Sequence, residues 1–190
     1  MEFPPRPDPW QRVRSENGPH LEVMAVRYDW RRHPRSGEVH KRVVLESNDW
    51  VNVVATTPGG RIVVVRQYRV AIDRVTTEIP GGLVDDGETP LEAARRELQE
   101  ESGYRSDDWR LMGSVEPNPA ILDNVCHTFW ARDARPEGGT AFDPGEDLTV
   151  DTLTLEAVRE EIAAGTFRHS LAVLAVAMVF PLWPDPPMAG

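Results

Sequence analysis

The stretch GLVDDGETPLEAARRELQEESGY, residues 82–104, is a glycine-containing loop followed by a helix with signals at both ends. Thr89 is a residue type that caps helices, Pro90 suits the first helical position, and Glu92 completes a capping box with Thr89. Gly103 can end the helix because glycine readily adopts the left-handed conformation found just after helix C-termini. The sequence therefore predicts a helix that begins at Pro90 and ends before Gly103.

Three glutamates lie along one edge of this predicted helix. An apolar stripe at helical spacing, which we expect to pack on a sheet, consists of Leu91, Ala94 and Leu98. The glutamates beside this stripe are Glu97, Glu100 and Glu101. Like charges at this spacing repel one another, and a hard divalent cation such as Mg²⁺ would offset the repulsion because it prefers oxygen ligands. The alternative is a solvated helix face on which Arg95 and Arg96 pair with nearby glutamates.

The same stretch carries glycine, glutamate and arginine at fixed spacings. Gly82 is followed after five residues by Glu88, and after seven more by the run Arg96-Glu97-Leu98-Gln99-Glu100-Glu101-Ser102-Gly103-Tyr104. This pattern resembles the Nudix box, G-x5-E-x7-R-E-U-x-E-E-x-G-U, in which U is a bulky apolar residue. Seven fixed polar or glycine positions match, and one departure is Tyr104, where an aliphatic residue is usual. An aromatic side chain can still pack there.

Segments on both sides of the box extend the resemblance to residues 39–174. The approach, Arg66-Gln67-Tyr68-Arg69 and then Glu78-Ile-Pro-Gly-Gly, is similar to that of the ADP-ribose and nucleoside-diphosphate-sugar pyrophosphatase branch. Downstream, Asn118-Pro119-Ala120-Ile121, followed by Asp123, Asn124 and His127, is similar to the sugar-nucleotide hydrolases of that branch.

The resemblance implies an enzyme that hydrolyses the diphosphate linkage of ADP-ribose or a nucleoside diphosphate sugar to a nucleoside monophosphate and a sugar phosphate. It implies Mg²⁺ as the cofactor, with Mn²⁺ as an alternative. The implied metal ligands are the Gly81 carbonyl and the carboxylates of Glu97, Glu100 and Glu101. Arg96 is expected to orient these glutamates, and Glu88 to support them by hydrogen bonds rather than by ligation. Gly82 lets the backbone turn closely at this point.

The resemblance also implies that the general base comes from a loop well after the box. In Phe142-Asp-Pro-Gly-Glu146-Asp147 we favour Glu146 as the base, with Asp147 as the alternative; together with Glu100 and Arg96 it forms the expected catalytic set. A turn rich in Asp, Pro and Gly is also typical of any exposed loop. The residues expected to contact substrate are Arg69, Glu78, Asn118 and Asp123.

The order of the predicted elements favours an α/β fold. Strands are expected at 21–28, 39–46, 50–56, 62–67, 109–116, 127–132 and 148–155, and helices at 155–164 and from Ser170. The resemblance implies a Nudix-type α/β/α sandwich with a mixed sheet and an N-terminal antiparallel extension. We divide the chain into a flexible proline-rich arm (1–20), a β-hairpin extension (21–48), the Nudix domain (49–183) and a tail (184–190). In this branch such an extension builds a homodimer, so the resemblance also implies a homodimer.

Composition excludes several other classes of protein. The 31 Asp and Glu residues outnumber the 21 Lys and Arg residues, which argues against a nucleic-acid partner. The partner that the resemblance implies is a small nucleotide-sugar. The longest uncharged apolar run, residues 171–183, is too short to span a membrane. A single cysteine and the lack of a signal-like leader indicate a cytoplasmic protein. Two alternatives to the pyrophosphatase function are considered. One is a nucleotide-sensing module of the same fold without turnover, for which gaps in the glutamate set would be expected. The other is a nucleoside triphosphate hydrolase.

Overall fold

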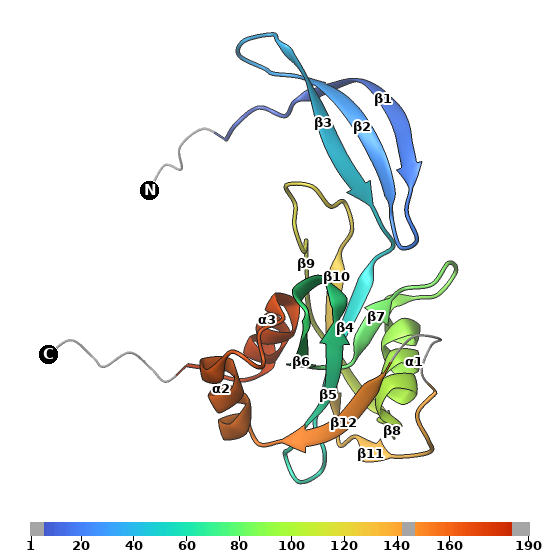
Figure 1. Ribbon diagram of the computed structural model, residues 1–190, viewed down its shortest axis with the longest axis vertical. Helices are drawn as coiled ribbons and strands as arrows, with labels where there is room; N and C mark the ends of the chain where they lie inside the picture. The colour runs from blue at the N-terminus through green and yellow to red at the C-terminus, as the bar shows by residue number, and fades with distance from the viewer. Residues whose placement is uncertain (1–5, 142–146, 184–190) are drawn as a thin grey trace, which may run out of the picture. The chain divides into compact units, whose positions relative to one another are not determined.

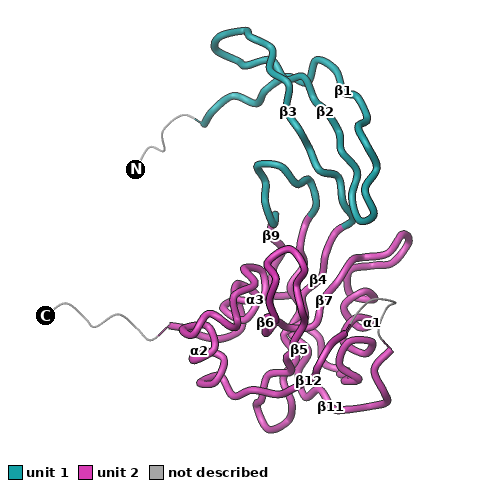
Figure 2. Tube along the Cα trace, in the orientation of Figure 1, with its two compact units in different colours: residues 1–48, 116–124 teal, residues 49–115, 125–190 magenta. Residues whose placement is uncertain are grey.

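The computed structural model describes residues 6–141 and 147–183 of the 190. The chain divides into two compact units (Figure 2). Unit 1 contains the chain up to Asn48 together with Glu116–Asn124, and unit 2 contains Asp49–Val115 and the chain from Val125 onward.

Unit 1 is built on a three-stranded antiparallel sheet in the order β1-β2-β3 (Figure 1). Its strands are β1 (Gln11–His20), β2 (Ala25–Arg32) and β3 (Val39–Glu46). The predicted hairpin is confirmed, since β2 pairs with β3 from Ala25 opposite Glu46 to Arg32 opposite Val39.

The prediction of a flexible arm over residues 1–20 is wrong for residues 11–20, which form β1. This segment is polar and shows no clear alternation, so its strand pairing comes from tertiary contacts rather than from its own propensity. The Ser15 hydroxyl donates to the carboxylate of Asp29, and the Arg14 guanidinium lies 3.6 Å from the centre of the Trp30 ring. Asp29 is fully buried, and Arg31 also donates to its carboxylate.

Unit 2 contains a mixed four-stranded sheet in the order β7-β4-β10-β9. Its strands are β4 (Trp50–Ala55), β7 (Gly81–Leu83), β9 (Asp108–Val115) and β10 (Cys126–Arg132). Strands β4 and β10 are parallel, whereas β7 and β9 run antiparallel to their neighbours. A second, antiparallel sheet contains β12 (Leu148–Leu153), β5 (Ile62–Arg69) and β6 (Arg74–Glu78), and a two-stranded pair contains β8 (Tyr104–Arg105) and β11 (Arg135–Pro136).

Side chains from the strands of unit 2 enter two apolar cores, one on each side of the sheets. The residues of the β5 run Ile62-Val-Val-Val65 alternate between these cores: Ile62 and Val64 pack with α2 and α3, and Val63 packs with α1. This arrangement explains why the run is continuously apolar, because both of its faces are buried. The predicted α/β/α sandwich with a mixed sheet is confirmed.

Among the described residues of unit 2, three α-helices cover the sheets (Figure 1). They are α1 (Pro90–Ser102), α2 (Leu155–Ala164) and α3 (Ser170–Val179), and a short 3₁₀ helix, η1, spans Val70–Ile72. The predicted ends of α1 are confirmed, with the capping box of Thr89 and Glu92 and with Gly103 at φ 69°. In the described part of the chain, no helix has the length and apolar character needed to cross a bilayer.

Candidate active site

Helix α1 lies against strand β7, and two of its glutamates reach the two glycines that begin this strand. The backbone N–H of Gly81 donates a hydrogen bond of 2.9 Å to Oε2 of Glu101, whose side chain is buried. A Cβ atom added to Gly82 would lie only 2.3 Å from Oε1 of Glu97. Glycine is therefore required at position 82 for the strand to pass so close to this carboxylate.

Arg96 binds the remaining acidic residues of the cluster. It donates from Nε and Nη2 to the two carboxylate oxygens of Glu88, at 3.1 and 3.0 Å, and from Nη1 to Glu97 at 2.7 Å and Glu100 at 3.2 Å. Its Nη2 also donates to the carbonyl of Leu83 at 2.9 Å, which ties the helix to the end of β7. The hydrogen bonds with Glu88 raise the pKa of Arg96, and those from Arg96 lower the pKa of Glu88. Arg96 and Glu88 are thus both charged over the physiological range.

The cluster carries more negative than positive charge. Arg96 pairs with Glu88, Glu97 and Glu100, and the cluster also contains the buried Glu101. Most of these carboxylates are partly or fully removed from solvent. Such an excess is unfavourable unless a cation offsets it, and all nearby donors are oxygens, which suit a hard divalent ion. Within residues 6–141 and 147–183, no three His, Cys, Asp or Glu side chains form a ready-made metal-binding group. The donors fit such an ion chemically, but Arg96 holds Glu97 and Glu100 in ion pairs.

Two residues predicted to contact substrate, Arg69 and Glu78, are paired with each other. Arg69 donates from Nε and Nη2 to the two oxygens of Glu78, both at 2.8 Å, and the Thr76 hydroxyl donates to the same carboxylate. Burial alone would raise the pKa of Glu78, but the hydrogen bonds and the charge of Arg69 outweigh it and lower this pKa. The pair borders a hollow of about 270 Å³ at the start of α3, where Nε2 of His169 lies 4.0 Å from Glu78.

The other predicted substrate residues, Asn118 and Asp123, belong to unit 1. The backbone carbonyl of Asn118 accepts hydrogen bonds from the N–H groups of Ile121 and Leu122, so its backbone forms a turn. The carboxylate of Asp123 lies 3.4 Å from Nη1 of Arg27. Of the two candidates for the general base, Glu146 lies outside the described residues, and Asp147 is exposed just before β12.

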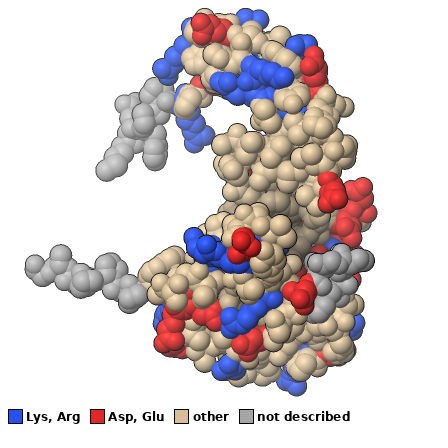
Figure 3. Space-filling model, viewed as in Figure 1, with Lys and Arg blue, Asp and Glu red and all other residues tan. Residues whose placement is uncertain are grey.

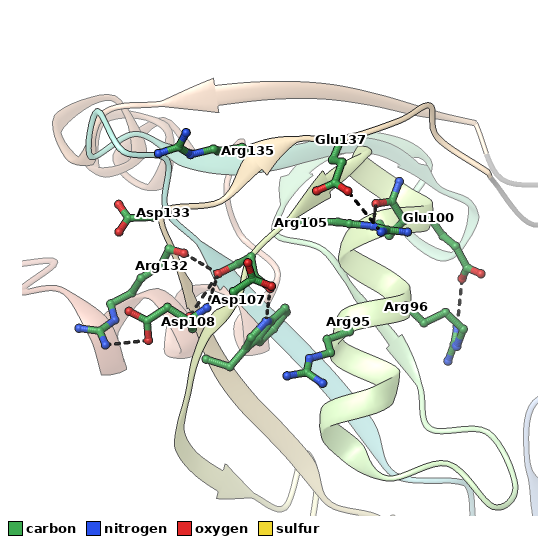
Figure 4. Close-up of a pocket in the computed structure, with 13 residues that line it drawn as sticks. Arg95, Arg96, Glu100, Arg105, Asp107, Asp108, Arg132, Asp133, Arg135 and Glu137 are labelled. Atoms are coloured by element: carbon green, nitrogen blue, oxygen red, sulfur yellow. Dashed lines mark hydrogen bonds and ion pairs between the residues drawn. The ribbon is translucent and has the colours of Figure 1, made fainter.

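A larger hollow, of about 1090 Å³, adjoins the glutamate cluster at Arg96 and Glu100 (Figure 4). Its lining contains as many arginines as acidic residues, and several of these are paired. Arg132 lies 2.7 Å from Asp108, and Arg105 lies 3.5 Å from Glu137. The balance of charge in this hollow differs from the acidic cluster that it borders.

The structure brings together the residues of the box and the glycines before it, but it also adds neighbours that the sequence analysis did not identify. The Leu83 carbonyl accepts a hydrogen bond from Arg96, and no sequence signal marks it because every residue has a backbone carbonyl. Thr76 could have been found from the 62–78 hairpin, since it is two residues from Glu78 on the same strand face. His169 is the N-cap residue of α3, far along the chain, and could not have been found from local pattern.

A protein-family model for the NUDIX domain matches residues 48–172. The chain therefore belongs to the Nudix hydrolase family, in agreement with the pattern around α1 and with the sandwich fold.

Several individual proteins are also similar to this chain in sequence or in fold. The "Methanol dehydrogenase activator" of Bacillus methanolicus is 31% identical over 142 residues, which cover 74% of this chain and 77% of that protein. The "ADP-ribose pyrophosphatase" of Mycobacterium tuberculosis is 31% identical over 159 residues, which cover 83% of this chain and 76% of that protein. A crystal structure described as an "ADP compounds hydrolase" superposes with a TM-score of 0.81 at 21% identity, over 93% of this chain and 95% of that one, and so shows the fold.

Proposed function

We propose that this protein hydrolyses the diphosphate linkage of ADP-ribose or a nucleoside diphosphate sugar, and releases a nucleoside monophosphate and a sugar phosphate. The observation that carries the proposal is the cluster of glutamates on α1 at the glycines of β7, with its excess negative charge. The named activity of the mycobacterial relative supports this substrate class.

The acidity of unit 2 supports a role for a bound cation. By sequence, unit 2 carries 22 Asp and Glu residues against 12 Lys and Arg residues, whereas the two kinds number 9 each in unit 1. In the view of Figure 3, Lys and Arg side chains gather on unit 1, while unit 2 shows acidic and basic side chains side by side. A diphosphate is an anion, so an acidic unit repels it unless bound cations reverse the local charge.

We assign Mg²⁺ as the cofactor, with Mn²⁺ as an alternative, held by Glu97, Glu100, Glu101 and the Gly81 carbonyl. When bound, such ions neutralise the diphosphate and lower the pKa of a bound water. Arg96 holds the glutamates in place before binding, and Glu88 holds Arg96 through its two-oxygen contact. Gly82 provides the clearance in which the Glu97 carboxylate lies.

For the general base we retain Glu146, with Asp147 as the alternative. The test is a pair of isosteric variants, Glu146→Gln and Asp147→Asn. Loss of the base is expected to lower kcat by about 10² or more. An unchanged rate in Glu146→Gln together with a large loss in Asp147→Asn would transfer the role to Asp147.

The substrate-contacting roles of Arg69, Glu78, Asn118 and Asp123 stay predictions. Because Glu78 already accepts from Arg69 and Thr76, we expect this pair to shape the site more than to exchange its partners for substrate. Asn118→Ala and Asp123→Ala should raise KM without lowering kcat if these side chains bind substrate.

A homodimer is proposed because apolar side chains are exposed on both units. Val39 and Val43 are exposed on β3 in unit 1, and Val70 and Val75 are exposed near the turn between β5 and β6, with Val70 82% exposed. Light scattering should give twice the chain mass, and Val43→Glu or Val70→Glu should lower it if either surface forms the interface. A monomeric wild-type protein would contradict this proposal. The cytoplasmic location also stays a prediction.

The function is tested with a panel of ADP-ribose, nucleoside diphosphate sugars, dinucleotides and nucleoside triphosphates, scored by product identity with and without Mg²⁺. The proposal predicts metal-dependent release of a nucleoside monophosphate and a sugar phosphate, and Glu101→Gln should abolish it while the fold is retained. Preferred cleavage of triphosphates would identify the alternative hydrolase. Tight binding without turnover of any compound would identify a sensing module.

A further inference from the structure

Residues 137–141, Glu-Gly-Gly-Thr-Ala, lie across the C-terminal end of α1, and we call this segment the strap. The N–H of Glu137 donates to the carbonyl of Gly103 at 2.8 Å, and the N–H of Ala141 donates to the carbonyl of Glu100 at 2.9 Å. The last carbonyls of a helix lack hydrogen-bond donors within the helix. The strap supplies N–H donors here in place of water. One of these carbonyls belongs to a candidate metal ligand.

The strap touches the helix so closely that glycines are needed on both sides. A Cβ on Gly103 would lie 3.0 Å from the carbonyl oxygen of Gly138, and a Cβ on Gly138 would lie 3.3 Å from Nε2 of Gln99. Gly138 has φ 110°, a backbone conformation that other residues rarely adopt. The contact therefore depends on Gly138, which lies outside the box pattern, as well as on Gly103 within it.

Gln99 joins the strap to the helix with both ends of its amide. Its Nε2 donates to the carbonyl of Gly139 at 3.3 Å, and its Oε1 accepts from Nε of Arg105 at 2.6 Å. Arg105 in turn pairs with Glu137 of the strap, as Figure 4 shows at the rim of the larger hollow. Gln99 occupies the position that the box leaves unspecified, between Leu98 and Glu100.

The two glutamates that follow Gln99 are fixed to different extents. Glu101 is 5% exposed, and its carboxylate accepts from the N–H of Gly81. The side chain of Glu100 is 37% exposed and pairs with Arg96. Its position therefore depends more on the hydrogen bond from the Ala141 N–H to its backbone carbonyl than the position of the buried Glu101 depends on such a contact.

We propose that Gln99 is a positioning residue which, through the strap, holds Glu100 and the last turn of α1 in place for metal binding. This inference rests on the proposed function, because it assigns Glu100 and Glu101 to the metal. It concerns how the site is held, and Gln99 itself need not contact metal or substrate.

Two substitutions of Gln99 separate positioning from general stability. Gln99→Ala removes both hydrogen bonds. Gln99→Glu keeps an acceptor for Arg105 and adds a charge to it, but it places an oxygen against the carbonyl of Gly139. A merely structural role predicts that both variants bind metal normally, whatever their change in stability. A positioning role predicts that both variants bind metal more weakly.

The measurements are Mn²⁺ affinity without substrate, by electron paramagnetic resonance, and hydrogen exchange at the Ala141 amide. We expect Mn²⁺ affinity to fall about fivefold, the scale of one net hydrogen bond, and exchange at Ala141 to accelerate in both variants. In assays of turnover, the half-activating Mg²⁺ concentration should rise while KM for substrate is unchanged. Gly138→Ala, which disturbs the strap from its own side, should give the same result. Arg95→Ala, on the exposed side of the same helix, is the control and should match wild type.

Mn²⁺ affinity within twofold of wild type in Gln99→Ala, Gln99→Glu and Gly138→Ala would overturn the inference, and so would a wild-type protein that binds no Mn²⁺. If the wild-type protein binds Mn²⁺ but hydrolyses no compound of the panel, the proposed function fails. The effect of the variants on Mn²⁺ affinity then still decides whether Gln99 holds the metal-binding glutamates.

Discussion

Replacing Gly82 with alanine should damage the metal site while the fold is retained. The added Cβ would lie 2.3 Å from Oε1 and 2.5 Å from Cδ of Glu97. Because non-bonded carbon atoms are favourably placed at about 3.5 Å, the Glu97 carboxylate must move by about 1 Å. The backbone of Gly82 itself does not oppose alanine, since its φ lies outside the left-handed region.

A shift of this size at a catalytic group can cost about 10² in rate. We therefore expect kcat of Gly82→Ala to fall about 100-fold and the half-activating Mg²⁺ concentration to rise. The melting temperature should change by only a few degrees, because Glu97 is at the edge of the core and its side chain can move. The assays are hydrolysis of ADP-ribose over a range of Mg²⁺ concentrations and thermal unfolding of the same samples.

Two further variants test whether the damage arises from contact with Glu97. In Gly82→Ala/Glu97→Asp the carboxylate is withdrawn by one methylene, which should restore the clearance and recover part of the activity. Gly81→Ala is the contrasting case, because its Cβ would lie 2.3 Å from the backbone carbonyl of Val51 on β4, which cannot move alone. That variant should lose stability first. Wild-type turnover and metal dependence in Gly82→Ala would refute the reasoning.

Three other outcomes can be measured on the same protein. Arg69→Ala should lower the free energy of unfolding by about 2 kcal/mol at pH 7, because it leaves the buried Glu78 without its charge partner. The pKa of Glu78 is lowered in the wild-type fold, so the pair stabilises the fold at pH values above the pKa that Glu78 has in the unfolded chain. This stabilisation is lost as the pH falls through the lowered pKa. The difference between wild type and Arg69→Ala in urea unfolding should thus be larger at pH 7 than at pH 4, and an equal difference at both values would contradict it. Arg96→Ala should lower the melting temperature in EDTA and recover more than wild type when Mg²⁺ is added, because the cation then replaces the lost positive charge; a smaller gain than in wild type would argue against a cation site at these glutamates. Burial raises the pKa of the Cys126 thiol to about 11, so iodoacetamide should label it at pH 8 only after denaturation, and rapid labelling of the folded protein would show that the thiol is accessible.

Much of the fold follows from signals that are local in the sequence. Thr89 and Gly103 mark the ends of α1 by their own conformational preferences, and the predicted helix at 155–164 coincides with α2. Strand β1 could not be predicted in the same way, because its polar residues become a strand only by pairing with β2. The short strands β7, β8 and β11 have two or three residues each, too few for an alternating pattern to be visible.

In the candidate site, too, some features follow from local sequence and others depend on distant segments. Residues of the box share one helix and the loop before it, so a correct helix places Glu97, Glu100 and Glu101 on one edge without knowledge of the rest of the fold. What the helix cannot specify is which backbone meets that edge: the Gly81 N–H at Glu101 and the strap at Glu100 come from 20 and about 40 residues away. Spacing within a helix thus identifies the chemical groups, and distant backbone sets their positions. A variant that keeps every glutamate but moves that backbone, such as Gly138→Ala, should therefore impair metal binding in a way that the box alone does not predict.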